Sequence, residues 1–98
     1  MLIAPIEISQ TASAGAWAFN TPKFSGSDLR QIIIKAATAT TTFDVTITDE
    51  YSNEVYSKEG NTGALNELLY LPLRGVYTVA VSTSSANEAY TGRLLMEE

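Results

Sequence analysis

The densest group of side chains that could do chemistry is acidic and lies in one short stretch. Asp49, Glu50 and Glu54 surround a segment of turn-forming residues, and Asn53 adds an amide oxygen. Carboxylate and amide oxygens are the ligands that calcium prefers, but the spacing is not that of an EF-hand loop. Turns are naturally rich in Asp, Asn and Ser. We therefore expect a solvated turn here and no metal site.

The composition removes most catalytic machinery. The chain has no His and no Cys, which excludes histidine-dependent triads, thiolate chemistry and disulfides. Paired carboxylates for glycoside hydrolysis need a cleft in which one acid is desolvated. A chain of 98 residues has little room for such a cleft. We predict a protein that is not an enzyme and has no cofactor.

The charge is negative and unevenly distributed. Residues 1–43 carry three bases and two acids, whereas residues 44–98 carry three bases and nine acids, for a net charge of -5. An acidic chain without a basic patch repels phosphate, so no nucleic acid partner is expected. No apolar stretch approaches the roughly 20 residues that cross a bilayer, so no membrane partner is expected. Pro5 and Glu7 interrupt the first apolar run, and we expect no signal peptide.

The aromatic residues allow a second class of function. Trp17 with Tyr51, Tyr56 or Tyr70 would stack on sugar rings if the fold brought them together, as in a carbohydrate- or cell-surface-binding β-sandwich module. They are far apart in sequence, so anchoring in the core or at a protein interface is the favoured interpretation. Exposed rings in one plane would favour the sugar-binding alternative, and buried rings would favour a structural protein.

The chain is organised around the stretch Leu69–Val81. Apolar residues occupy every second position on both sides of Arg74-Gly75, which predicts two strands joined by a sharp corner that crosses a core. Tyr77 is the first inward residue after that corner. In sandwich domains such a tyrosine is buried and its hydroxyl bonds back to the corner backbone. An ordinary core tyrosine remains the alternative.

The remaining pattern also predicts strands. Thr40–Thr48 alternates cleanly and forms a hairpin with Glu54–Lys58, whereas residues 60–63 have the composition of a loop and the next strand is expected from about Glu67. The prediction is an all-β single domain over residues 1–98, an antiparallel β-sandwich, Ig-like or jelly-roll-like, of about seven or eight short strands. The predicted core consists of Ile6, Ile8, Ile32, Ile34, Phe43, Val45, Ile47, Leu69, Leu71, Tyr77, Val79, Val81 and Leu94.

Three features indicate a surface for other subunits. Residues 9–28 have a loop or arm composition interrupted by aromatic residues, Pro5 marks the first strand as a sheet edge, and apolar groups stand on both faces at Ile32-Ile33-Ile34. The Trp17-Ala18-Phe19 alternation is either a short strand on the domain's own core or part of an arm on another subunit. The predicted partner-binding residues are Leu2, Ile3, Pro5, Trp17, Phe19, Phe24 and Ile33.

Two resemblances follow from these residues. The run Gly75-Val76-Tyr77-Thr78-Val79-Ala80-Val81 after Leu71-Pro72-Leu73 resembles the end of bacterial pre-peptidase C-terminal β-sandwich modules, which ride on secreted enzymes. As a small, acidic, Cys-free sandwich, the chain is also similar to head decoration or cement proteins of tailed bacteriophages. That resemblance implies a homo-oligomeric virion protein, assembled in the host cytoplasm, whose partner is the major capsid protein or another virion protein.

Overall fold

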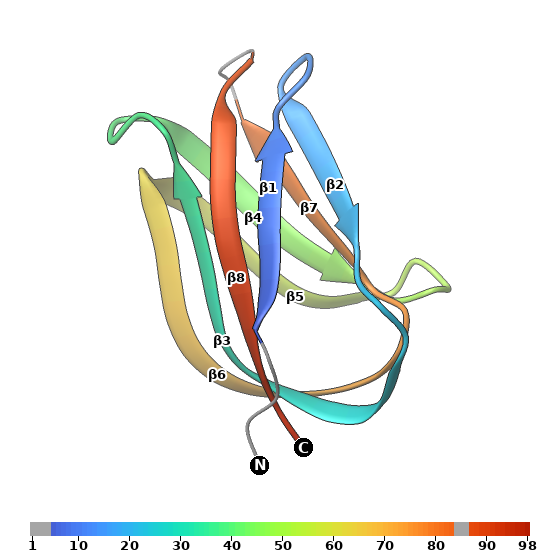
Figure 1. The fold of residues 1–98 in the computed structure, drawn as a ribbon. Coiled ribbons are helices and arrows are strands. Elements are labelled where there is room, and N and C mark those ends of the chain that lie inside the picture. The colour runs from blue at the N-terminus through green and yellow to red at the C-terminus, as the bar shows by residue number, and fades with distance from the viewer. Residues whose placement is uncertain (1–4, 84–86) are drawn as a thin grey trace.

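The computed structural model describes residues 5–83 and 87–98, and within these residues every regular element is a β-strand (Figure 1). Strands form because β-branched and aromatic residues alternate with polar ones over most of the chain. The eight strands are β1 (Ile6–Thr11), β2 (Ala16–Asn20), β3 (Phe24–Ala36), β4 (Thr42–Thr48), β5 (Glu54–Thr62), β6 (Ala64–Gly75), β7 (Thr78–Thr83) and β8 (Ala89–Glu97).

The strands form two antiparallel four-stranded sheets packed as a sandwich, in the orders β1-β8-β3-β6 and β5-β4-β7-β2. Between the sheets, β5 and β6 pair only at Thr62 and Ala64. Each sheet combines strands from both halves of the chain, which is the jelly-roll arrangement. The predicted antiparallel sandwich is confirmed, in its jelly-roll form.

The core lies between the sheets and follows the predicted alternation. Of the predicted core residues, Ile6, Leu69 and Leu71 are only partly buried, and the other ten are buried. The prediction omitted residues of both sheets that also face inward, namely Ala12, Trp17, Phe24, Leu29, Ala36, Leu65, Leu73, Tyr90 and Met96.

The predicted corner is confirmed in detail. It carries the chain from β6 in one sheet to β7 in the other. The backbone N–H of Arg74 donates to the Tyr77 hydroxyl at 2.9 Å, and the Tyr77 N–H donates to the Thr21 hydroxyl at 3.0 Å. Tyr77 is 8% exposed. Gly75 has φ 96°, which glycine adopts without a steric penalty and which makes the sharp turn accessible.

The expected loop at residues 60–63 is wrong. β5 continues to Thr62 and β6 begins at Ala64 rather than near Glu67, so Gly63 alone separates them. Gly63 has φ 75°, and a Cβ there would lie 2.5 Å from the Ala39 carbonyl oxygen. Asn61 is buried because its side-chain amide donates to the carbonyls of Phe43 and Lys58 at 3.1 and 3.0 Å. These bonds satisfy the buried polar side chain of Asn61, although the surrounding segment has the composition of a loop.

Candidate functional site

Two of the predicted partner-binding residues lie in the chain's own core. Trp17 is 6% exposed and packs on Tyr90 with the ring centroids 5.8 Å apart. Phe24 is buried beside Tyr77, at 6.4 Å between centroids. Trp17 belongs to β2, which pairs with β7, so the short strand is the alternative that the structure contains. Leu2 and Ile3 lie outside the described residues.

The other three predicted residues lie on separate parts of the molecule, and Phe19 packs partly against the core. Pro5 is exposed and precedes β1, which pairs only with β8 and is therefore a sheet edge. Ile33 is partly buried on the outer face of the same sheet, and Phe19 is partly buried on β2 of the other sheet. The structure does not bring the three together into one patch. Their role in binding a partner stays a prediction.

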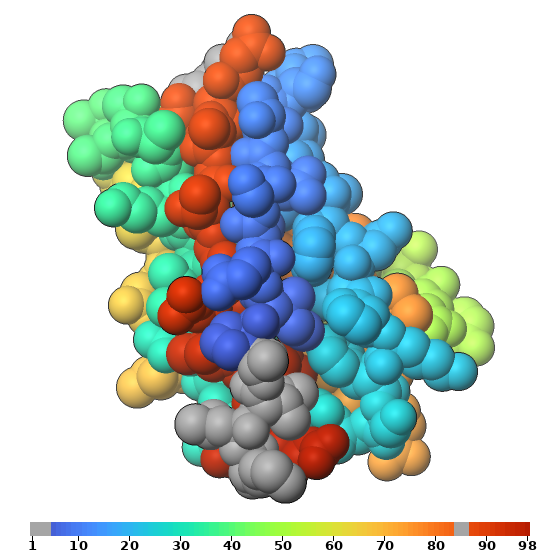
Figure 2. Space-filling view, in the orientation of Figure 1, coloured from blue at the N-terminus to red at the C-terminus, as the bar shows by residue number. Residues whose placement is uncertain are grey.

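Ile33 is part of the outer face of the β1-β8-β3-β6 sheet, which Figure 2 views from the front. A shallow pocket of about 360 Å³ lies there, lined by Ile33, Lys35, Arg93, Glu7, Thr91 and Gly92. Arg93 forms an ion pair with Glu7 at 3.0 Å. The pocket thus has one apolar side chain and a charged rim.

The most exposed apolar side chains of the described residues lie elsewhere. Leu68 is 78% exposed and Tyr70 64% exposed, two positions apart on β6. The Arg30 guanidinium lies over the Tyr70 ring, 5.5 Å from its centroid, and also pairs with Glu97 at 2.7 Å. Sequence reasoning missed this surface because Leu65, Leu68 and Leu69 also fit a helical turn.

β6 also has an open edge. On one side it pairs with β3 along most of its length. On the other side, within the described residues, it pairs with β5 only at Ala64, opposite Thr62. Glu67 spans the gap with its side chain, because its carboxylate accepts the Tyr56 hydroxyl at 2.8 Å and lies 3.9 Å from the Lys58 ammonium. The two sheets are thus linked by side chains rather than by a ladder where they separate.

Tyr56 is electrostatically altered by this contact. Partial burial and the neighbouring Glu67 carboxylate raise the pKa of the Tyr56 hydroxyl well above its ordinary value. Both effects disfavour the phenolate, first by desolvation and then by like-charge repulsion and hydrogen bonding to the neutral form. A phenol that resists ionisation serves here as a hydrogen-bond donor between the sheets.

The acidic turn uses its carboxylates internally. Asp49 accepts the backbone N–H groups of Tyr51 and Asn53 at 2.8 and 2.9 Å, together with the Asn53 side-chain amide. These bonds lower the pKa of Asp49. The Glu50 carboxylate accepts the Val76 N–H at 2.8 Å. The carboxylates organise the turn and tie it to the β6–β7 corner.

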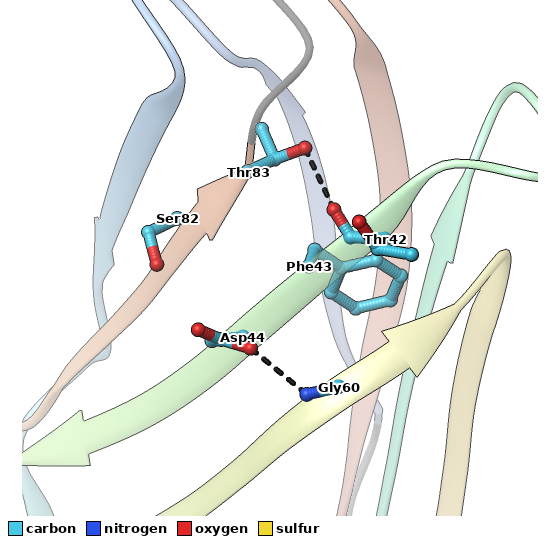
Figure 3. A pocket seen from close by; sticks show the side chains of 6 residues that line it. All are labelled: Thr42, Phe43, Asp44, Gly60, Ser82 and Thr83. Atoms are coloured by element: carbon cyan, nitrogen blue, oxygen red, sulfur yellow. Dashed lines mark hydrogen bonds between the residues drawn. The ribbon is translucent and has the colours of Figure 1, made fainter.

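A second pocket, of about 290 Å³, lies over β4, β5 and β7 (Figure 3). The Asp44 carboxylate accepts the Gly60 N–H at 2.9 Å, and the Thr83 hydroxyl donates to the Thr42 carbonyl at 2.9 Å. Ser82 is the register partner of Asp44. The lining offers hydroxyls and one carboxylate already bonded to backbone, but no cation or imidazole to activate a nucleophile.

The aromatic residues do not form a sugar-binding platform. Trp17 is buried, whereas Tyr51 is 83% exposed at the turn after β4 and Tyr70 stands on β6 of the other sheet. Tyr56 is partly buried and points its hydroxyl at Glu67. Because Trp17 lies in the core, it does not share an exposed plane with Tyr51 or Tyr70.

The chain matches no protein-family model and no curated protein sequence. Solved structures do share its fold. A mitogen from Yersinia pseudotuberculosis superposes with a TM-score of 0.60 at 7% identity, covering 97% of this chain and 86% of that one. The NLP core of Drosophila superposes with a TM-score of 0.54 at 12% identity, covering 98% of this chain and all of the other. These likenesses establish the jelly-roll sandwich and nothing about activity.

Viral capsid proteins are also among the structural neighbours. The structure of infectious bursal disease virus, Gt strain, matches with a TM-score of 0.42 at 9% identity, covering 96% of this chain and 30% of that one. A likeness of that degree is too weak to argue from. Within the described residues, no group of three or more acidic side chains is placed to hold a metal ion, and no helix is long and apolar enough to span a membrane.

Proposed function

We propose that this chain is a non-catalytic structural protein of a virion, a head decoration or cement subunit of a tailed bacteriophage that braces the assembled capsid through protein–protein contacts. The observation that carries the proposal is the outer surface of the β1-β8-β3-β6 sheet. It combines an open edge strand with exposed apolar side chains at Leu68 and Tyr70 and a partly buried Ile33. Surfaces of this kind mark contacts with other proteins.

The chemistry of the described residues supports a binding role. The Asp49 and Asp44 carboxylates both accept backbone N–H groups. The fold is compatible with such a role, since jelly rolls build capsid and lectin domains. The NLP core, whose structure bears on pentamer formation and histone binding, has the same fold. That comparison is an analogy of fold alone.

The capsid contact that we propose depends on the apolar side chain of Ile33 on the outer face of the β1-β8-β3-β6 sheet, beside which Arg93 is paired with Glu7. Apolar contacts depend on buried area, whereas exposed ion pairs are screened by salt. Binding to capsid shells is therefore expected to change little with ionic strength. The partner is the major capsid protein or another virion protein, and the location is the virion.

The proposal is tested with shells assembled from the major capsid protein encoded beside this gene. The full chain is mixed with the shells and sedimented, and the bound fraction is compared for Ile33→Glu and the matched control Thr46→Glu on the opposite sheet. We expect Ile33→Glu to lose binding and Thr46→Glu to retain it. A gene without capsid or portal neighbours, or a wild-type chain that does not sediment with the shells, would contradict the proposal.

A further inference from the structure

A further pocket, of about 450 Å³, lies where the turn after β4 faces the corner between β6 and β7. Lys23 and Phe24 line it from the start of β3, Tyr51 from the turn and Arg74 from the end of β6. Sites for small molecules are concave and measure about 300–1,000 Å³. This pocket has that size, and it shares no lining residue with the pocket beside Ile33.

Two cations at the pocket have no acidic partner. Within the described residues, three basic side chains form ion pairs with acids, and neither Lys23 nor Arg74 is among them. Both side chains are exposed. Lys and Arg are the residues that bind a carboxylate, and Arg can do so through two parallel N–H···O bonds. The pocket therefore offers hydrogen-bond donors to an anion.

The backbone opposite Arg74 is irregular. β3 bulges there, because Ser25 and Gly26 together face this one residue of β6. Gly26 has φ 131°, which glycine adopts without a steric penalty. The Nη2 atom of Arg74 lies 3.5 Å from the position that a Cβ at Gly26 would take. The bulge thus receives the end of the Arg74 side chain, and bulges commonly redirect side chains beside functional sites.

The carboxylates at the pocket are already bonded to the backbone. Asp49 accepts the N–H groups of Tyr51 and Asn53. Glu50 accepts the Val76 N–H at 2.8 Å. These two acids balance the two cations in charge, so the lining is neutral overall. A neutral lining does not attract a polyanion such as nucleic acid, whereas a ligand with a single carboxylate needs only the donors of the two cations.

Tyr51 supplies a flat ring beside these donors. It is 83% exposed and lines the same pocket. A tyrosine presents an apolar ring face and a polar hydroxyl, which together suit a sugar ring with its C–H and O–H groups. A sugar that carries a carboxylate would use both the ring and the cations. An acidic side chain of a peptide would use the cations alone.

We propose that this pocket binds a sugar residue that carries one carboxylate, a uronic acid, with the carboxylate on Arg74 and Lys23 and the sugar ring on Tyr51. The site uses one exposed ring and does not need a platform of several. It is separate from the proposed function, because the shell contact is placed at Ile33.

The test is an NMR titration of the full chain in which backbone amide shifts report both affinity and location. The probes are methyl glucuronide and methyl glucoside, which has a hydroxymethyl group in place of the carboxylate. N-acetylglutamate amide represents a peptide carboxylate, and acetate represents an adventitious ion only. The variants are Arg74→Gln, Lys23→Gln and Tyr51→Ala. Lys35→Gln is the matched control, since Lys35 is an exposed cation that forms no ion pair within the described residues and does not line the pocket. Circular dichroism checks that every variant is folded.

We expect methyl glucuronide to shift the amides of Ser25, Tyr51 and Gly75 saturably, with a dissociation constant of about 1 mM. Methyl glucoside should bind at least about tenfold more weakly, each pocket variant should raise the glucuronide dissociation constant at least about tenfold, and Lys35→Gln should not change it.

The absence of a saturable shift up to about 10 mM would overturn the proposal. So would shifts confined to amides away from the pocket, equal binding of the two glycosides, or pocket variants that bind as the wild type does. Acetate or N-acetylglutamate amide that binds as tightly as the glucuronide would also overturn it, in favour of an adventitious ion only or of a peptide site. None of these results would affect the shell-binding test.

Discussion

The hydroxyl of Tyr77 is the group through which the corner between the two sheets is fastened. It accepts the Arg74 backbone N–H at 2.9 Å, from a side chain that is 8% exposed. Replacing Tyr77 by Phe leaves the ring in the core but deprives that N–H of its partner. Leaving a buried donor unsatisfied costs about 1–3 kcal/mol, and the partial exposure of this bond places the expected loss at about 1–2 kcal/mol.

The matched control is the other buried tyrosine. The Tyr90 hydroxyl has no hydrogen-bond partner among the described residues, although Tyr90 is 1% exposed. Removing an unsatisfied buried hydroxyl relieves a desolvation cost, so Tyr90→Phe is expected to be neutral or stabilising. The two substitutions delete the same atom from the same residue type, and only Tyr77→Phe is predicted to lower the free energy of unfolding.

Urea denaturation followed by Trp17 fluorescence measures both variants, because Trp17 is the only tryptophan and is buried. The loss for Tyr77→Phe corresponds to a melting temperature lower by about 4–8 °C for each kcal/mol. Equal destabilisation by the two variants would refute the reasoning, since it would mean that the corner bond has no special role or that Tyr90 has a partner of its own.

Three further outcomes are expected. Phe43→Ala removes a ring that is 2% exposed and packed edge-on against Tyr90, with the ring centroids 5.4 Å apart. The free energy of unfolding measured by urea denaturation should fall by about 3–5 kcal/mol. An unchanged midpoint would mean that the strand faces are reversed. Folding raises the Tyr56 pKa from 10.0. The stability that this shift contributes is therefore present below pH 10.0 and is lost as the pH rises above it. Tyr56→Phe should flatten this part of the stability–pH curve. The lowered Asp49 pKa acts in the opposite direction, so the stability that it contributes is lost as the pH falls below 3.8. Acid denaturation of Asp49→Asn should therefore show a smaller loss of stability at low pH.

The parts of the fold that the sequence predicts are those set by local alternation. β4 is an example, because Phe43, Val45 and Ile47 alternate with polar residues and all three are buried. The Tyr77 corner is another, since a glycine turn and a following tyrosine define it within a few residues. In both cases the determining interactions lie close together in the chain.

The parts that it does not predict depend on contacts between distant segments. Trp17 is buried because β2 packs over Tyr90, more than seventy residues away. Asn61 belongs to a strand because its amide finds the Phe43 carbonyl, a partner that composition does not reveal. Such long-range contacts override the local preference of a segment.

The candidate surface was only partly predictable for a related reason. Ile33 was identified from apolar residues on both faces of β3, and the same signal was present at Leu68-Leu69. At Leu68-Leu69 the signal could not be told from a helical pattern, because Leu65 lies three and four positions before these residues. An apolar side chain that faces solvent looks the same in a sequence as one that faces a core. The open edge of β6 becomes apparent only when the pairing of all strands is known.

The most direct test of the central claim is co-sedimentation of the full chain with shells of the major capsid protein encoded beside its gene, at low and at high salt. The account predicts saturable binding whose dissociation constant is nearly the same at both ionic strengths, because the contact is apolar. Absence of binding would contradict the proposed role. Binding that disappears at high salt would contradict the apolar contact and would indicate docking by charge.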